Sequence, residues 1–176
     1  MIRKPFLFLD RDGIINEVVI REGRIESPRS VDEFVIRNEF INFYSKLHSL
    51  NCSLFIVSNQ PDIARGIMDY NVLDNINQIL RSEFVFNDIL YCTHDDSDKC
   101  SCRKPKPGLI NSLIEQYSLS KDDSLILGDS WKDIECGKRA GIKTILLNTE
   151  YNKTQKCLPD YSINNLDQLL QVDIWS

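Results

Sequence analysis

The chain has 176 residues, of which 42% are hydrophobic and 27% are charged, and its formal net charge is -5. This length predicts one domain over residues 1–176 with its own core, and no apolar run approaches the roughly 18 residues of a membrane span. The negative charge disfavours a nucleic-acid-binding protein, and the absence of a charged-then-apolar leader predicts a cytoplasmic protein.

Short β-rich apolar runs alternate with longer segments of helical periodicity. Strands are predicted at Phe6–Leu9, Ser53–Val57, Asp88–Tyr91, Ser124–Leu127 and Thr144–Leu147. Helices are predicted at Glu39–Leu50, Val72–Phe84, Pro107–Tyr117 and Trp131–Ala140, with a short closing helix at Leu166–Val172. This alternation is typical of an α/β fold, with a Rossmann-like parallel sheet covered by helices on both faces. The remaining segments read as loops, and none is long enough for a large cap domain.

Two acidic residues follow the first predicted strand directly. Because strand side chains alternate between faces, we expect Asp10 and Asp12 to share a face and Arg11 to point away. In open α/β sheets, ligands bind beyond the carboxyl ends of the strands. The pair is therefore a candidate reactive site, although an Asp-x-Asp-Gly sequence by itself fits a polar turn equally well.

Two further predicted strands also end in polar residues. The second is followed by Ser58, Asn59 and Gln60, and the fourth by Asp129, Ser130 and Asp133. With Asp10 and Asp12, these ends supply a carboxylate nucleophile, a hydroxyl and amides for phosphate oxygens, and a third acid for Mg²⁺. Lys104, which precedes a predicted helix, provides a fixed cation. Together they predict a magnesium-dependent phosphoryl-transfer site.

Four soft metal ligands lie close together in residues 92–102: Cys92, His94, Cys100 and Cys102. This spacing predicts a Cys₃His zinc site, and four protein ligands make the zinc structural because no position remains for water. Free or disulfide-bonded cysteines are the alternative, which a cytoplasmic location disfavours. Arg103 and Lys104 follow the last ligand, so zinc would order the loop that presents them.

These motifs, taken in order, resemble the haloacid dehalogenase superfamily of Mg²⁺-dependent aspartyl phosphatases over nearly the whole chain. The zinc loop at 92–102 and the sequence Cys-Arg-Lys-Pro resemble a narrower group, the D-glycero-D-manno-heptose 1,7-bisphosphate phosphatases and the histidinol-phosphate phosphatases. The sequence Ile-Ala-Arg-Gly at 63–66 favours the heptose enzymes. The resemblance therefore implies removal of one phosphate from heptose 1,7-bisphosphate to leave the heptose 1-phosphate.

The resemblance also implies roles for individual residues. Asp10 would be the nucleophile and Asp12 the general acid and base, while Ser58 and Lys104 would hold the phosphoryl group. The Mg²⁺ ligands would be the side chains of Asp10 and Asp129 and the carbonyl of Asp12. Substrate contacts would come from Asn59, Gln60, Arg65 and Arg103, in a protein that acts as a monomer on a small phosphorylated sugar.

Two positions depart from the family pattern. Ile14 stands where threonine is usual, and Asp62 stands where glycine is usual, which adds a negative charge close to an anionic substrate. Three other functions stay open. A histidinol-phosphate phosphatase shares the zinc loop, and a receiver-like signalling domain shares acids and a lysine at strand ends but needs neither Asp12 nor zinc. A catalytically inactive zinc module is the third.

Overall fold

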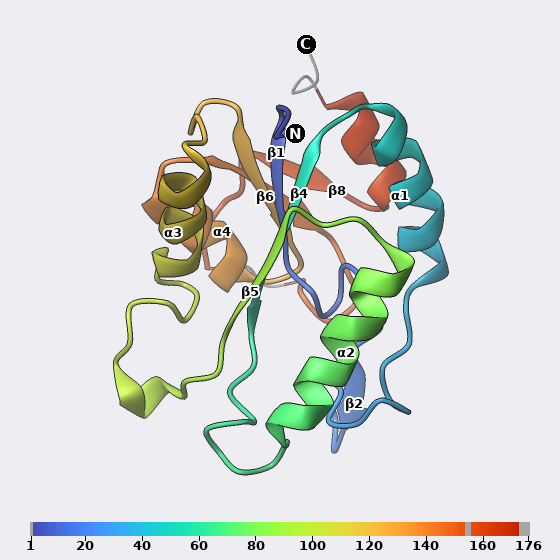
Figure 1. Ribbon diagram of the computed structural model, residues 1–176, viewed down its shortest axis with the longest axis vertical. Coiled ribbons are helices and arrows are strands. Elements are labelled where there is room, and N and C mark those ends of the chain that lie inside the picture. Colours follow the sequence, from blue (N-terminus) through green and yellow to red (C-terminus); the bar gives the residue numbers. More distant parts are fainter. Residues whose placement is uncertain (1, 154–155, 173–176) are drawn as a thin grey trace.

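Six parallel strands form one sheet in the order β5-β4-β1-β6-β7-β8. The computed structural model describes residues 2–153 and 156–172 (Figure 1). The strands are β1 (Phe6–Leu9), β4 (Ser53–Asn59), β5 (Asp88–Cys92), β6 (Ser124–Gly128), β7 (Lys143–Leu147) and β8 (Tyr161–Ile163). All five predicted strands are present, and the parallel α/β architecture is confirmed.

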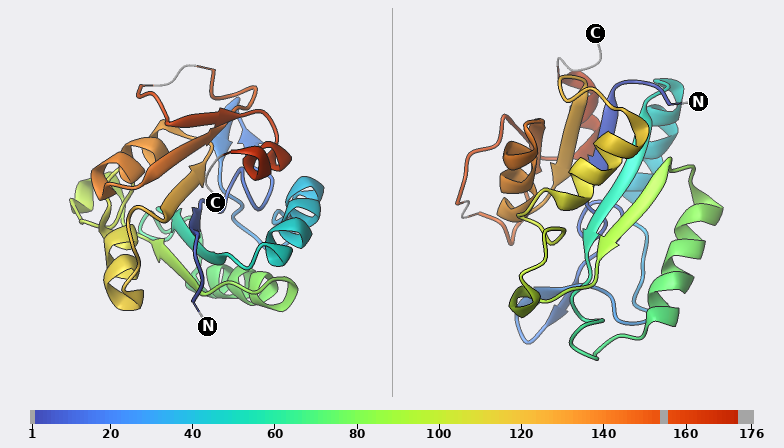
Figure 2. Two further views of the ribbon diagram at one scale, coloured as in Figure 1. Left: turned by 90° about the horizontal axis from the view of Figure 1, so that it is seen from above. Right: turned by 60° about the vertical axis from the view of Figure 1, so that its left-hand side comes forward.

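Helices cover both faces of this sheet. They are α1 (Asn38–Ser49), α2 (Tyr70–Glu83), α3 (Gly108–Tyr117) and α4 (Trp131–Ala140), with short 3₁₀ helices η1 (Asp96–Asp98) and η2 (Leu166–Gln171). Helices α1 and α2 lie on one face and α3 and α4 on the other (Figures 1 and 2). None of the helices in the described residues is long and apolar enough to cross a bilayer.

The apolar run of β1 serves two cores at once. Phe6 and Phe8 pack in the cluster under α3 and α4, whereas Leu7 and Leu9 pack in the cluster under α1 and α2. All four side chains are buried. A central parallel strand needs apolar residues at every position because both of its faces are covered, which explains the uninterrupted sequence Phe-Leu-Phe-Leu.

Three short strands were not predicted. Strands β2 (Val19–Arg21) and β3 (Arg24–Glu26) form an antiparallel hairpin, and β8 lies in a turn-rich segment. Glu22 and Gly23 connect the hairpin with φ values of 50° and 74°, as expected for a type I′ turn. The expectation that the segments outside the predicted strands and helices are loops was wrong at these three places, because strands of three residues are too short to show a period of two.

The strand register brings distant residues to the same edge of the sheet. Leu9 pairs with Ile56 of β4 and with Leu127 of β6. The residues that follow these three positions therefore lie side by side toward the carboxyl edge of the sheet. In Figure 1 this edge lies at the lower end, next to β2 and opposite the N-terminus.

Candidate active site

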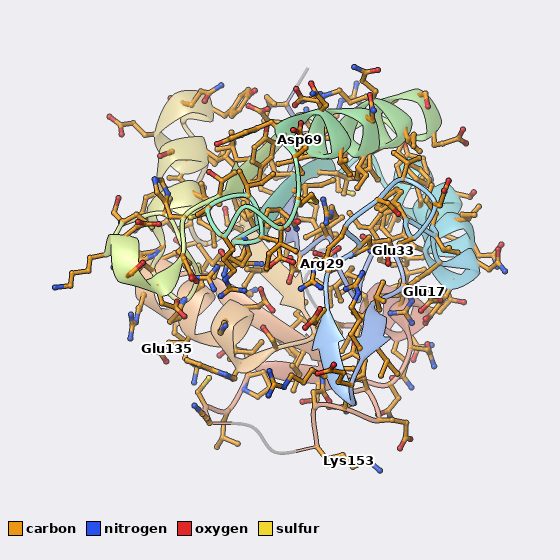
Figure 3. All side chains as sticks on the ribbon, turned by 90° about the horizontal axis from the view of Figure 1, so that it is seen from below. Glu17, Arg29, Glu33, Asp69, Glu135 and Lys153 are labelled. Carbon is orange, nitrogen blue, oxygen red and sulfur yellow. The ribbon has the colours of Figure 1, made fainter. Side chains whose placement is uncertain are left out.

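A cavity of about 510 Å³ opens at the carboxyl edge of the sheet. Figure 3 looks onto this edge. The predicted site residues that line the cavity are Asp10, Asp12, Asn59, Gln60, Arg65, Arg103, Lys104 and Asp129. Ser58 lies beneath it, 2% exposed, and its hydroxyl accepts a hydrogen bond from Gln60 Nε2 at 2.8 Å. The structure thus brings the ends of β1, β4 and β6 together with Lys104, which follows the predicted zinc loop.

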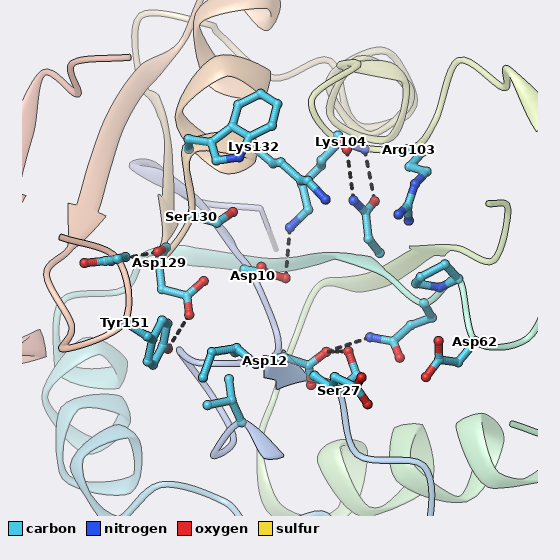
Figure 4. Close-up of a pocket in the computed structure, with 18 of the residues that line it drawn as sticks. Asp10, Asp12, Ser27, Asp62, Arg103, Lys104, Asp129, Ser130, Lys132 and Tyr151 are labelled. Carbon is cyan, nitrogen blue, oxygen red and sulfur yellow. Dashed lines mark hydrogen bonds and ion pairs between the residues drawn. The ribbon is translucent and has the colours of Figure 1, made fainter. Parts of the chain in front are cut away.

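Lys104 lies at the centre of the buried charges. Its Nζ is 2.9 Å from Asp10 Oδ1 (Figure 4). It also lies 2.6 Å from Asp133 Oδ1 and donates to the carbonyl of Val57 at 2.8 Å. Burial by itself lowers the pKa of Lys104, but Asp10 and Asp133 together raise it above its ordinary value. The lysine is therefore a fixed positive charge beside Asp10.

Asp133 is fully buried and was noted only as an acid following the fourth strand, without an assigned role. Its Oδ2 accepts hydrogen bonds from Ser130 N at 3.1 Å and Ser130 Oγ at 2.5 Å, a capping box at the start of α4. A Cβ on Gly128 would lie 2.3 Å from Asp133 Cγ, so only glycine fits there. The spacing of Ser130 and Asp133 in the sequence is the signal that identifies this arrangement.

Asp129 is held by residues that sequence reasoning did not identify. Tyr151 OH donates to Asp129 Oδ2 at 2.5 Å, and Asn152 Nδ2 donates to the Asp129 carbonyl at 2.7 Å. A Cβ on Gly13 would lie 2.0 Å from Asp129 Oδ2, and Gly13 has a φ of 84°. The glycine after the acidic pair therefore leaves the space in which the Asp129 carboxylate sits.

Asp12 accepts hydrogen bonds from several directions. Its donors are Arg11 Nε at 3.0 Å, Asn16 Nδ2 at 2.9 Å, Ser27 Oγ at 2.8 Å and Gln60 Nε2 at 2.8 Å. Arg11 does not point to solvent, because it is 1% exposed and turns back onto this carboxylate. Burial alone raises the pKa of Asp12, but these donors outweigh it and leave the pKa below its ordinary value.

The pKa values of Asp10 and Asp129 are shifted in the opposite direction from that of Asp12. Burial raises the pKa of Asp10 well above its ordinary value, and neighbouring acids add to this effect against Lys104. Burial and the charge of Asp133 likewise raise the pKa of Asp129 to about 7. Oxygen atoms of Asp10, Asp129 and Asp133 lie within 4.8 Å of one another. This crowded set of hard oxygen donors fits a divalent cation such as Mg²⁺.

The side-chain amide of Asn59 is hydrogen-bonded to the backbone of Lys104. Its Nδ2 donates to the Lys104 carbonyl and its Oδ1 accepts from the Lys104 amide, both at 3.0 Å. Arg65 is engaged as well, because its guanidinium donates to Asp62 at 3.2 Å and to Asp95 at 2.7 Å. Among the described residues, the Arg103 side chain hydrogen-bonds only through Nε, which donates to Asp96 at 2.8 Å.

The predicted zinc ligands converge. Cys92 Sγ lies 3.4 Å from His94 Nδ1, 3.6 Å from Cys100 Sγ and 3.1 Å from Cys102 Sγ. Tetrahedral zinc with sulfur ligands at about 2.3 Å and nitrogen at about 2.0 Å would separate its ligands by roughly 3.5–3.8 Å. The four atoms thus lie close to the positions that a zinc ion requires.

A parallel sheet with a central β1, and with acids around one buried lysine at its carboxyl edge, fits the class of haloacid-dehalogenase-like hydrolases. The HAD-hydrolase-like family matches residues 101–169. In overall structure the chain is similar to D,D-heptose 1,7-bisphosphate phosphatase from B. bronchiseptica, which was solved with magnesium and phosphate. The TM-score is 0.82 at 26% identity, over 94% of this chain and 98% of that one.

Curated relatives that are similar in sequence show which members of this class the chain resembles. The D-glycero-D-manno-heptose-1,7-bisphosphate 7-phosphatase of Chlorobaculum tepidum is 30% identical, covering 92% of this chain and 90% of its own length. The D-glycero-beta-D-manno-heptose-1,7-bisphosphate 7-phosphatase of Pseudomonas aeruginosa is 31% identical over 83% of this chain and 82% of its own length. A relative named for the alpha anomer, from Photorhabdus laumondii, is 34% identical over 80% of each chain. The chain belongs to the haloacid-dehalogenase-like phosphatase family that includes these heptose bisphosphate phosphatases.

Proposed function

We propose that this phosphatase removes the 7-phosphate from D-glycero-D-manno-heptose 1,7-bisphosphate. The observation that carries the proposal is the Asp10–Lys104–Asp133 ion-pair cluster beside Asp12, at a cavity that is also lined by Arg29, Arg65 and Arg103. A reacting phosphate at Asp10 would meet Lys104, and the far end of a bisphosphate would meet cationic side chains of the cavity wall, Arg103 among them. The cavity of about 510 Å³ suits a compact sugar phosphate.

In the proposed reaction, an Asp10 carboxylate oxygen attacks phosphorus, and the bond from phosphorus to the sugar oxygen breaks. Asp12 donates a proton to that oxygen as it leaves. Water then attacks the aspartyl-phosphate, Asp12 takes the proton from the water, and the bond between phosphorus and Asp10 breaks. The lowered pKa of Asp12 keeps the carboxyl ionised, which is the form that can accept a proton in this second step. Proton donation in the first step requires Asp12 to lose some of its four hydrogen-bond donors.

The side chains of Asp10 and Asp129, with the backbone carbonyl of Asp12, would hold Mg²⁺. When bound, the ion neutralises carboxylates that must approach an anionic phosphate and stabilises the transferring oxygens. Lys104 holds the phosphoryl group from the opposite side, and Ser58 contributes its hydroxyl beneath Gln60. The raised pKa values of Asp10 and Asp129 support this assignment, because both groups lack sufficient positive charge in the protein alone.

Zinc on Cys92, His94, Cys100 and Cys102 would have a structural role. The ligands enclose the segment that carries Asp96, which accepts from Arg103 at 2.8 Å. The zinc loop would therefore orient Arg103 and, through the chain that follows, Lys104. Gln60 and Arg103 line the cavity and are the proposed substrate contacts. Arg65 lines it too, but its guanidinium is bound to Asp62 and Asp95. Asn59 would act by positioning Lys104.

We further propose that residues 1–176 act as one domain, as a cytoplasmic monomer, on this small molecule and without nucleic acid or membrane partners. The six-stranded sheet, which runs from β1 to β8, supports the single domain, and the acidic composition supports the absence of a nucleic-acid partner.

The test is Mg²⁺-dependent phosphate release from heptose 1,7-bisphosphate and from histidinol phosphate in parallel assays, with Asp10→Asn as the blank. We expect a strong preference for the bisphosphate and no release by the variant. A preference for histidinol phosphate would overturn the substrate, and normal turnover by Asp10→Asn would overturn the mechanism. A receiver-like function would instead show an aspartyl-phosphate that persists without releasing phosphate.

A further inference from the structure

Asp62 occupies an unusual electrostatic position at the cavity wall. Its side chain is 8% exposed, yet the residue lines the cavity. Arg29 Nε donates to its Oδ2 at 2.7 Å, and Arg65 Nη1 donates to its Oδ1 at 3.2 Å. Each carboxylate oxygen therefore holds one guanidinium. Arg29 comes from the segment after β3 and Arg65 from the loop between β4 and α2, so Asp62 joins two separate walls of the site.

These contacts belong to a longer row of alternating charges around the cavity mouth. Arg29 Nη2 also lies 2.8 Å from Glu26 Oε2, and Arg65 Nη2 lies 2.7 Å from Asp95 Oδ1 in the zinc loop. We call Glu26, Arg29, Asp62, Arg65 and Asp95 the rim network. Figure 3 shows Arg29 near the centre of this face, close to the β2–β3 hairpin. The network links the hairpin segment, the loop after β4 and the zinc loop.

Two other cations on the cavity wall, Arg103 and Lys132, form no ion pair with a buried carboxylate among the described residues. Arg103 is 8% exposed, and its Nη1 is buried without a hydrogen-bond partner in the described part of the chain. Lys132, at the start of α4, also lines the cavity and forms no ion pair within residues 2–153 and 156–172. Burial and then the nearby charge of Arg103 lower the pKa of Lys132. An incoming anion can bind these two groups without first breaking an ion pair with a buried carboxylate.

We infer that Asp62 is a specificity-determining residue that withholds Arg29 and Arg65 from the non-reacting end of the substrate. A second phosphate must compete with a buried carboxylate for both guanidiniums and also meets the negative charge of that carboxylate. It is therefore bound mainly by Arg103 and Lys132. The inference rests on the proposed function, because it concerns how strongly the same site selects a bisphosphate over a monophosphate of the same sugar.

The test measures kcat/KM for heptose 1,7-bisphosphate and for heptose 7-phosphate, and compares their ratio between variants. Asp62→Asn keeps the shape of the side chain and one acceptor but removes the charge. We expect the ratio to rise about tenfold, through a lower KM for the bisphosphate, which is the order expected for removing one charge near an anion. In Asp62→Asn/Arg29→Gln, which lacks one of the freed guanidiniums, the gain should be smaller.

Glu33→Gln is the matched control. Glu33 accepts from the Arg29 amide at 2.7 Å and pairs with Arg21, but it does not line the cavity. This control removes the same charge from the same region, and we expect it to leave the ratio unchanged. Should Asp62→Asn fold poorly, as judged by circular dichroism, Asp62→Gly serves as the second variant.

Binding is measured separately from turnover by calorimetry of the bisphosphate with Asp10→Asn and with Asp10→Asn/Asp62→Asn, where about tenfold tighter binding is expected in the double variant. An unchanged ratio, or an equal loss of affinity for both sugars, would show that Asp62 only holds the loops together and would overturn the inference. Wild-type protein that hydrolyses neither sugar would refute the proposed function instead. The calorimetric comparison would then decide whether Asp62 opposes the second phosphate.

Discussion

Replacement of Asn59 by alanine distinguishes a residue that positions Lys104 from one that binds substrate. In the structure both ends of the Asn59 amide bond to the Lys104 main chain at 3.0 Å. The alanine variant loses this clamp, so the loop that carries the lysine is free to shift. Because Lys104 Nζ contacts Asp10 at 2.9 Å, a shift of the loop disturbs the charge beside the proposed nucleophile.

The size of the effect follows from these two bonds. A hydrogen bond within a protein contributes a net of about 0.5–1.5 kcal/mol, so the clamp is worth roughly 1–3 kcal/mol. If that free energy is lost from the transition state, kcat falls about 5- to 150-fold. The KM should change little, because the Asn59 amide is already bound to the main chain and contributes little to substrate binding.

The assay is phosphate release over a range of substrate concentrations, together with thermal unfolding. Asn87→Ala is the matched control, because Asn87 Oδ1 also accepts from a backbone amide, that of Leu54, at 2.9 Å, without lining the cavity. We expect this control to lose about 1 kcal/mol of stability and to keep its kcat. A rise in KM with unchanged kcat in Asn59→Ala would refute the positioning role and support a direct contact with substrate.

Three further predictions concern the metals. Tyr151→Phe removes the donor to Asp129 Oδ2 and should weaken Mg²⁺ binding about 10- to 100-fold, as measured by calorimetry; unchanged affinity would contradict a role in orienting the ligand. The raised pKa of Asp129, about 7 against the ordinary 3.8, means that the metal-free fold holds a proton which the unfolded chain releases. Stability in chelator should therefore fall as the pH rises from about 4 to about 7, and thermal melts with Mg²⁺ should lack this fall. Cys102→Ser should lose zinc by metal analysis and lower phosphate release while keeping most Mg²⁺ binding, since its sulfur lies 3.3 Å from His94 Nδ1 in a separate cluster; normal zinc content would refute the ligand assignment.

The sequence predicted the strands that carry the acids because their apolar runs are long and end abruptly in polar residues. Strand β1 is the clearest case, since four buried residues precede Asp10. Parallel strands place such ends at one edge of a sheet. The position of Asp10, Asn59 and Asp129 at the ends of their strands in the sequence therefore predicts that they lie at the same edge. The four predicted zinc ligands were equally easy to find in the sequence, because all of them lie within residues 92–102.

Contacts between distant polar side chains could not be predicted in this way. The bond between Tyr151 and Asp129 spans 22 residues, and the one between Arg29 and Asp62 spans 33. Neither pair has a local pattern, because the partners meet only after the loops have folded over the sheet edge. The role of Asn59 could not be predicted for the same reason. Its position in the sequence suggests a phosphate-binding amide, but in the structure the amide is bound to the backbone of a residue 45 positions away.

The acids of this site differ in how their charge is neutralised, and this difference indicates where a cation is needed. Asp12 receives Arg11 and three neutral donors, and its pKa is lowered. Asp10 shares Lys104 with Asp133, and Asp129 has only Tyr151 and more distant charges, so both of their pKa values are raised. A dication bound between Asp10 and Asp129 would correct both shifts and leave Asp12 free to exchange protons. The charge distribution of the protein alone therefore favours the division between metal ligands and general acid-base that the proposed reaction requires.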